Sequence, residues 1–118
     1  MAYVDPGEVR HEIRLLTLQR TISDNDHYTD SEDSIIVRAA VRAVSAKDLV
    51  AYGADQEKET LQFIIRWHNR AKVTGDMQVE WRGKRYAIIY IDPTPWAGLW
   101  CRIKAVCQTG SGGEWLDG

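Results

Sequence analysis

Apolar and polar residues alternate with a period of two along much of this chain, and this pattern restricts the folds that it can adopt. Successive side chains of a β-strand point to opposite faces of a sheet, so the period is typical of strands with one buried face. It is clearest in Glu59–Trp67, where Leu61 and Phe63 share one face. Between two further alternating segments, Arg82-Gly83-Lys84 has the composition of a tight hairpin turn. The pattern predicts a mostly β chain with antiparallel neighbours.

Six alternating segments predict six strands, and their spacing favours a small antiparallel barrel or sandwich, of which we predict the β-barrel. Ser45 has the chemistry of a helix N-cap and Gly53 that of a helix end, so we expect one short α-helix over residues 46–52. The expected strands are His11–Arg20, Ile35–Val44, Glu59–Trp67, Met77–Trp81, Arg85–Ile91 and Leu99–Gln108.

The 118 residues, 13.5 kDa in mass, correspond to one domain. We predict an N-terminal arm over residues 1–10, the barrel over residues 11–108 and a flexible, glycine-rich tail over residues 109–118. No segment has the apolar core of a signal peptide, and none approaches the ~20 apolar residues that span a bilayer. We therefore expect a soluble protein that is made in the cytoplasm and does not bind membranes.

The segment Thr21–Ser34 differs from the rest because it carries five acidic residues and almost no apolar ones. Such a composition buries too little surface to offset the cost of ordering, so we expect a long, mobile loop. Asp24 and Asp26 resemble the first ligands of a calcium loop, but the glycine and the final glutamate of an EF-hand are missing, so we expect no metal. The candidate functional residues of this loop are Ser23, Asp24, Asn25, Asp26, His27, Tyr28, Asp30, Glu32 and Asp33.

The sequence offers no set of residues that would support catalysis. The three histidines stand in separate segments, without the spacing that places two ligands on one metal. Cys101 and Cys107 lie six residues apart on one predicted strand, too far apart to form a disulfide with each other. No glycine-rich loop precedes a helix, as phosphate binding would require. We therefore predict neither an enzyme nor a bound cofactor.

Tryptophan is frequent, and three of the five are difficult to place in a core. Trp96 stands between a proline and a turn, Trp100 lies on the charged face of its strand, and Trp115 is in the tail. Surface tryptophans supply large contact area at low entropic cost, so these three are the candidate protein interface. Aromatic residues interleaved with arginines could instead stack nucleic-acid bases, but a net charge of −2 and a pI near 5.9 disfavour this.

Four segments follow one another along the chain: Arg14–Arg20 (RLLTLQR), Val41–Leu49 (VRAVSAKDL), Thr60–Trp67 (TLQFIIRW) and Val79–Ile91 (VEWRGKRYAIIYI). In this order they resemble the head–tail joining proteins of tailed bacteriophages, also called head-closure, stopper or adaptor proteins. The resemblance covers about residues 11–108 and implies a small β-barrel without catalytic residues. It implies a neck component of the virion that assembles as a ring at the portal vertex and joins head to tail. It also implies that the loop Ser23–Asp33 reaches the channel and helps to retain packaged DNA.

The partners that this resemblance implies are other copies of the chain, in a ring of about six or twelve subunits, together with portal, adaptor and tail proteins. Packaged double-stranded DNA would pass through the ring, and the isolated subunit could be a monomer. Two alternatives stay open: a tail-completion or tail-terminator protein, and a small barrel that binds single-stranded nucleic acid.

Overall fold

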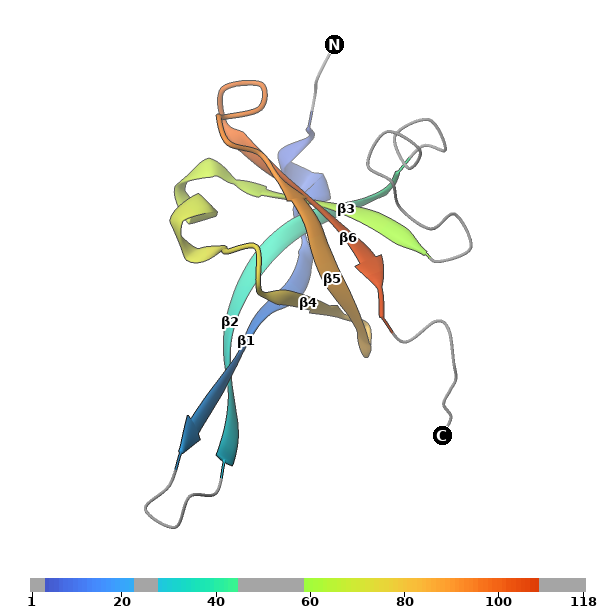
Figure 1. Cartoon of the computed structure of the whole chain (residues 1–118). Helices are drawn as coiled ribbons and strands as arrows, with labels where there is room; N and C mark the ends of the chain where they lie inside the picture. The colour runs from blue at the N-terminus through green and yellow to red at the C-terminus, as the bar shows by residue number, and fades with distance from the viewer. Residues whose placement is uncertain (1–3, 23–27, 45–58, 109–118) are drawn as a thin grey trace.

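The computed structural model describes residues 4–22, 28–44 and 59–108, which form a closed barrel of six antiparallel strands (Figure 1). The order around the barrel is β1-β2-β3-β6-β5-β4, so that β4 closes onto β1. The mostly β, antiparallel-barrel prediction is confirmed. The strands are β1 (His11–Ile22), β2 (Tyr28–Ala43), β3 (Thr60–Arg66), β4 (Gln78–Trp81), β5 (Lys84–Ile91) and β6 (Trp100–Cys107), and two 3-10 helices, η1 (Pro6–Glu8) and η2 (Trp67–Lys72), complete the described elements.

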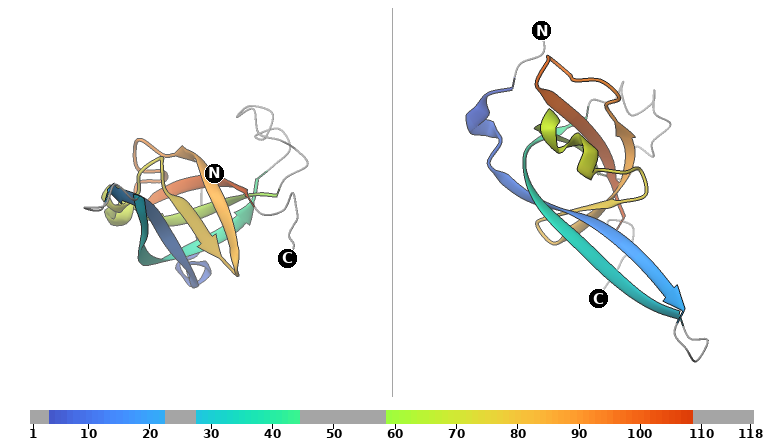
Figure 2. Two further views of the ribbon diagram at one scale, coloured as in Figure 1. Left: turned by 60° about the horizontal axis from the view of Figure 1, so that its bottom comes forward. Right: turned by 90° about the vertical axis from the view of Figure 1, so that its left-hand side faces the viewer.

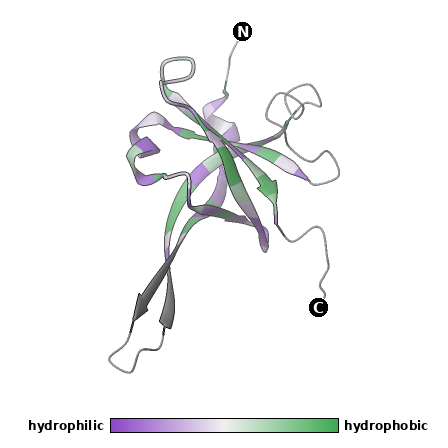
Figure 3. Cartoon of the chain, in the orientation of Figure 1, coloured by the Kyte–Doolittle hydropathy of each residue, from purple (hydrophilic) through white to green (hydrophobic). Residues whose placement is uncertain are grey.

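The inward residues of the alternating segments fill the barrel. Phe63 is fully buried and meets the rings of Tyr86 and Trp81 edge to face, at centroid distances of 5.5 and 6.1 Å. Aromatic pairs in this arrangement add to the stabilisation from burial. Figure 3 shows apolar residues concentrated on the barrel strands, with hydrophilic ones at η2 and at the β4–β5 turn. The remaining buried core residues are Ile13, Leu15, Val37, Ala39, Leu61, Ile65, Val73, Val79, Cys101, Ile103, Ala105 and Cys107.

A second, smaller apolar cluster lies outside the barrel and explains why β3 and β6 have apolar residues on both faces. Val4, Ala40, Ile64 and Trp100 pack together there, and the chain before β1 covers them. The guanidinium of Arg42 on β2 fixes this covering segment, because it donates two hydrogen bonds to the Glu8 carboxylate at 2.8 and 3.0 Å. Residues 4–10 of the predicted arm therefore pack against the barrel wall.

The predicted loop over Thr21–Ser34 is wrong for most of its length. Residues 21–22 and 28–34 belong to β1 and β2, which pair in continuous register from His11↔Ala39 to Ile22↔Tyr28. Backbone hydrogen bonds of the ladder provide the order that the polar side chains could not provide by burial. Residues 23–27 lie outside the described residues, as do the predicted helix over residues 46–52 and the tail over residues 109–118. Within the described part, no helix is long and apolar enough to cross a membrane.

Candidate assembly surfaces

The β1–β2 hairpin extends far beyond the barrel (Figures 1 and 2). β4 pairs with β1 only at Arg14–Leu16, and β3 pairs with β2 only at Ala40–Ala43. The outer part, Thr17–Ile22 with Tyr28–Asp33, is therefore a free two-stranded ribbon. The radius of gyration is 15.6 Å, whereas a compact chain of this length would have about 13.5 Å. The ribbon is the main departure of this molecule from a sphere.

The ribbon carries an excess of negative charge. Its two strands contain three acidic residues, Asp30, Glu32 and Asp33, and one arginine, Arg20, a net charge of −2. Arg20 stands opposite Asp30 in the strand register, and Asp33 is exposed where the ribbon leaves the barrel. The structure places this acidic segment in a projecting hairpin, where the sequence predicted a loop. Of the residues predicted for it, Tyr28, Asp30, Glu32 and Asp33 lie on β2, and Ser23, Asp24, Asn25, Asp26 and His27 are not described.

The loop between β5 and β6 is a second projecting feature. Trp96 and Trp100 face each other across its turn and exchange backbone hydrogen bonds of 2.8 and 3.0 Å. Ala97 and Gly98 between them have φ values of 53° and 79°, as a type I′ turn requires. Leu99 follows the turn and is 62% exposed, and the two prolines before the turn are exposed as well. The loop therefore presents apolar surface on a defined backbone.

The tryptophans behave differently from the sequence-based prediction. Trp100 was expected at the surface but is only 4% exposed, because the chain before β1 covers the outer face of β6. Trp96 is half-buried, with the Arg102 guanidinium 4.5 Å from its ring centroid, and Trp115 lies outside the described residues. The exposed apolar residue of this loop is Leu99, which the alternation had placed on the same face as Cys101. Its position beside a Gly-containing turn was the signal that could have identified it.

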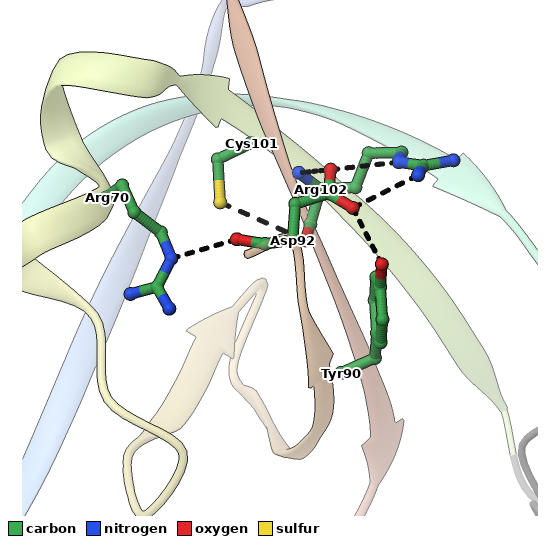
Figure 4. A network of polar contacts seen from close by, with 5 residues as sticks. All are labelled: Arg70, Tyr90, Asp92, Cys101 and Arg102. Atoms are coloured by element: carbon green, nitrogen blue, oxygen red, sulfur yellow. Dashed lines mark hydrogen bonds and ion pairs between the residues drawn. The ribbon is translucent and has the colours of Figure 1, made fainter. Parts of the chain in front are cut away.

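A buried carboxylate holds this loop in place (Figure 4). Asp92, 2% exposed, accepts hydrogen bonds from the Arg102 guanidinium at 2.9 and 3.0 Å and from the Arg102 backbone amide at 2.8 Å. The Tyr90 hydroxyl donates a further bond of 3.0 Å, and Arg70 of η2 donates to the Asp92 carbonyl at 3.0 Å. Burial alone would raise the pKa of Asp92, but the bonds from Arg102 and Tyr90 outweigh it and lower the pKa below its usual value.

The described residues contain no arrangement that suggests chemistry. No three of their His, Cys, Asp and Glu side chains come together in a way that could hold a metal ion. Cys101 is fully buried, and burial raises the pKa of its thiol to about 11, so it is a poor nucleophile. Cys107 is also buried, and both cysteines are thiols rather than halves of a disulfide. What the geometry offers is surface for contact: an acidic ribbon and an apolar turn.

Comparison with known proteins identifies a family and several solved structures with a similar fold. The family model for phage head completion proteins matches residues 4–108. The solution structure of protein SF1141 from Shigella flexneri 2a aligns with a TM-score of 0.72 and 19% sequence identity, covering 92% of this chain and 100% of that one. At this identity the likeness concerns the fold alone. No curated protein matches the chain.

Proposed function

Because this chain belongs to the phage head completion protein family, we propose that it assembles as a ring in the neck of the virion, joins head to tail and helps to retain packaged DNA. The match supports a structural role in completing the phage head and favours the head side of the joint over a tail-terminator role. The observation that carries the finer proposal is the acidic ribbon, which projects from a closed barrel and has no partner strands of its own.

The ribbon suits a channel through which DNA must pass. Six residue pairs, from Thr17↔Asp33 to Ile22↔Tyr28, extend it by about 20 Å beyond the barrel. Copies that point inward from a ring would form a narrow collar. Their excess of acidic residues would repel DNA phosphates within about one Debye length, roughly 8–10 Å, so the duplex would slide without adhering. The collar would obstruct the DNA sterically rather than bind it.

The turn between β5 and β6 supplies a contact for a neighbouring neck or tail protein. Its apolar tip includes Leu99, and the bonds to Asp92 keep the loop from moving. Apolar residues held rigidly at a surface bind at low entropic cost. We therefore assign to Leu99 and Trp96 the interface role that the sequence assigned to the three tryptophans.

Electron microscopy of particles made without this gene tests the proposed function. We expect DNA-free, tailless heads beside complete free tails. Intact tailed particles filled with DNA would overturn the proposal.

Two ribbon variants then separate length from charge. In one variant, an Asn-Gly turn replaces residues 20–30 and joins Gln19 directly to Ser31, its partner in the register. In the other, the ribbon keeps its length but carries Asp30→Asn, Glu32→Gln and Asp33→Asn. A collar that obstructs DNA sterically predicts DNA loss from particles with the short ribbon, whereas the particles that form with the neutral ribbon should keep their DNA, whatever their yield.

A further inference from the structure

A basic groove lies beside the base of the β1–β2 hairpin. It has a volume of about 370 Å³ and forms where β2, the end of β3 and η2 meet. Its described lining includes Arg38, Arg66, His68 and Lys72, all exposed, and no acidic residue. In a chain of net charge −2, such a concentration of cations is a local reversal of sign. The groove therefore has the chemistry to receive an anionic partner.

The cations of the groove are weakly engaged within the described part of the chain. Arg38 reaches Glu12 at 3.8 Å, but both side chains are about two-thirds exposed, and such pairs contribute little. The Arg66 guanidinium lies 5.0 Å from the Trp100 ring centroid, a contact that leaves its charge uncompensated. For Lys72 the described residues provide no ion pair. The positive field of the groove is thus available to a partner.

The acidic residues of the same ribbon cannot fill this groove. Asp33 stands five residues from Arg38 on the same strand, which places it about 16 Å away, and Asp30 is farther still. The ribbon is straight and leads away from the barrel (Figure 2). Among the described acidic residues of the ribbon, none is placed to fill the groove, which leaves it open to a segment from another subunit.

We propose that the basic groove receives the acidic β1–β2 ribbon of a second copy of this chain. The two surfaces are opposite in charge and lie on different parts of the molecule, and the described part of the chain provides no strong counterion for the groove. A contact between unlike surfaces is heterologous, and such contacts close into rings when the rotation permits. The inference rests on the proposed ring and specifies which surfaces join its subunits.

The duplex that passes through the neck is the other anion to consider. A duplex seated in the groove would extend along the acidic hairpin, from Asp33 onward, and would meet like charge there. The groove is also only a few residues wide, whereas proteins that bind duplex DNA non-specifically use an extended positive surface. The observations therefore favour a protein segment.

Charge exchange in the phage tests the contact, with each variant supplied in place of the normal gene. The groove variant carries Arg38→Glu and Lys72→Glu, and the ribbon variant carries Asp30→Lys and Glu32→Lys. We expect each alone to reduce the yield of tailed, DNA-filled particles by about tenfold or more, because like charges would then meet. Combining all four substitutions should restore most of the yield. Lys84→Glu, an exposed lysine on the β4–β5 hairpin, is the matched control and should leave the yield unchanged.

Cross-linking in purified particles tests the proximity directly. A chain with Asp30→Cys and Lys72→Cys should give a ladder of covalent oligomers on mild oxidation, whereas each single substitution should not. The native thiols are buried and should not contribute. The absence of a ladder, or a failure of the combined charge variant to recover, would overturn the inference. So would loss of salt-sensitive duplex binding by the groove variant, which would assign the groove to phosphates.

These outcomes separate the inference from the proposed function. If particles without the gene are tailless and empty but the groove variant assembles normally, the neck role stands and the contact is wrong. If particles without the gene are intact, the neck role itself fails.

Discussion

Replacing Asp92 by alanine removes the carboxylate around which the β5–β6 loop is built. Three side-chain hydrogen bonds and one from a backbone amide would be lost, three of the four from Arg102. Breaking a buried ion pair from one side typically costs about 3–5 kcal/mol. The Arg102 side chain is 25% exposed and can recover part of its hydration, so we place the loss of unfolding free energy at about 3 kcal/mol.

Urea denaturation followed by tryptophan fluorescence measures this loss. With an m-value of about 1.5 kcal/mol/M, the midpoint should fall by about 2 M, a large part of the stability of a domain of this size. Glu12→Ala is the matched control, because this acid is 63% exposed and its contact with Arg38 is long. It should change the stability by less than about 0.5 kcal/mol. If Asp92→Ala behaves like the control, the carboxylate does not hold the loop.

Four further predictions follow from the structure. The difference in unfolding free energy between the native chain and Asp92→Ala should be constant from about pH 5 to 7 and shrink as the pH falls below about 4. The pKa of Asp92 is lowered in the folded chain, so the stability that its carboxylate contributes is lost when it is protonated. A difference that grows in acid would contradict a lowered pKa. Phe63→Ala should cost about 3–5 kcal/mol in urea denaturation, since the ring is fully buried between two aromatic rings; a loss under 1 kcal/mol would show that the core collapses around the gap. Gly83→Ala should cost about 1 kcal/mol because φ is +78° although space is open, whereas Gly75→Ala, where φ is ordinary, should be close to neutral; equal effects at the two glycines would refute the argument from conformation. Leu99→Ser should leave the melting temperature unchanged but reduce the yield of tailed particles, and an unchanged yield would mean that the apolar turn is not an interface.

The strands that the sequence predicted well are those whose pattern reflects one buried face. The segment around Phe63 alternates because the barrel interior lies on one side of it. The hairpin Trp81–Lys84 was recognisable because a two-residue turn with positive φ requires glycine or a similar residue. In both places the residues that determine the structure are neighbours in the sequence, so the sequence alone was enough to predict it.

The features that the sequence missed depend on contacts distant in the chain. Trp100 lies on the charged side of its strand by alternation, but Val4, almost a hundred residues earlier, covers it. Residues 28–34 are too polar to predict a strand, yet pairing with β1 orders them. For the candidate surfaces, the sequence indicated the acidic segment and the tryptophan-rich turn, whereas the basic groove combines residues from β2, β3 and η2 that only the fold brings together.

The closed barrel and the open ribbon have opposite consequences for the aggregation of this chain before it is assembled. Where the barrel strands pair on both sides, they expose no unpaired backbone and cannot template the addition of another chain. In contrast, the outer half of the ribbon leaves a row of amides and carbonyls open along each side. Two identical ribbons that approach edge to edge would bring their acidic residues together, and this repulsion opposes indiscriminate stacking. The negative charge thus protects a part of the described fold that could otherwise nucleate aggregation.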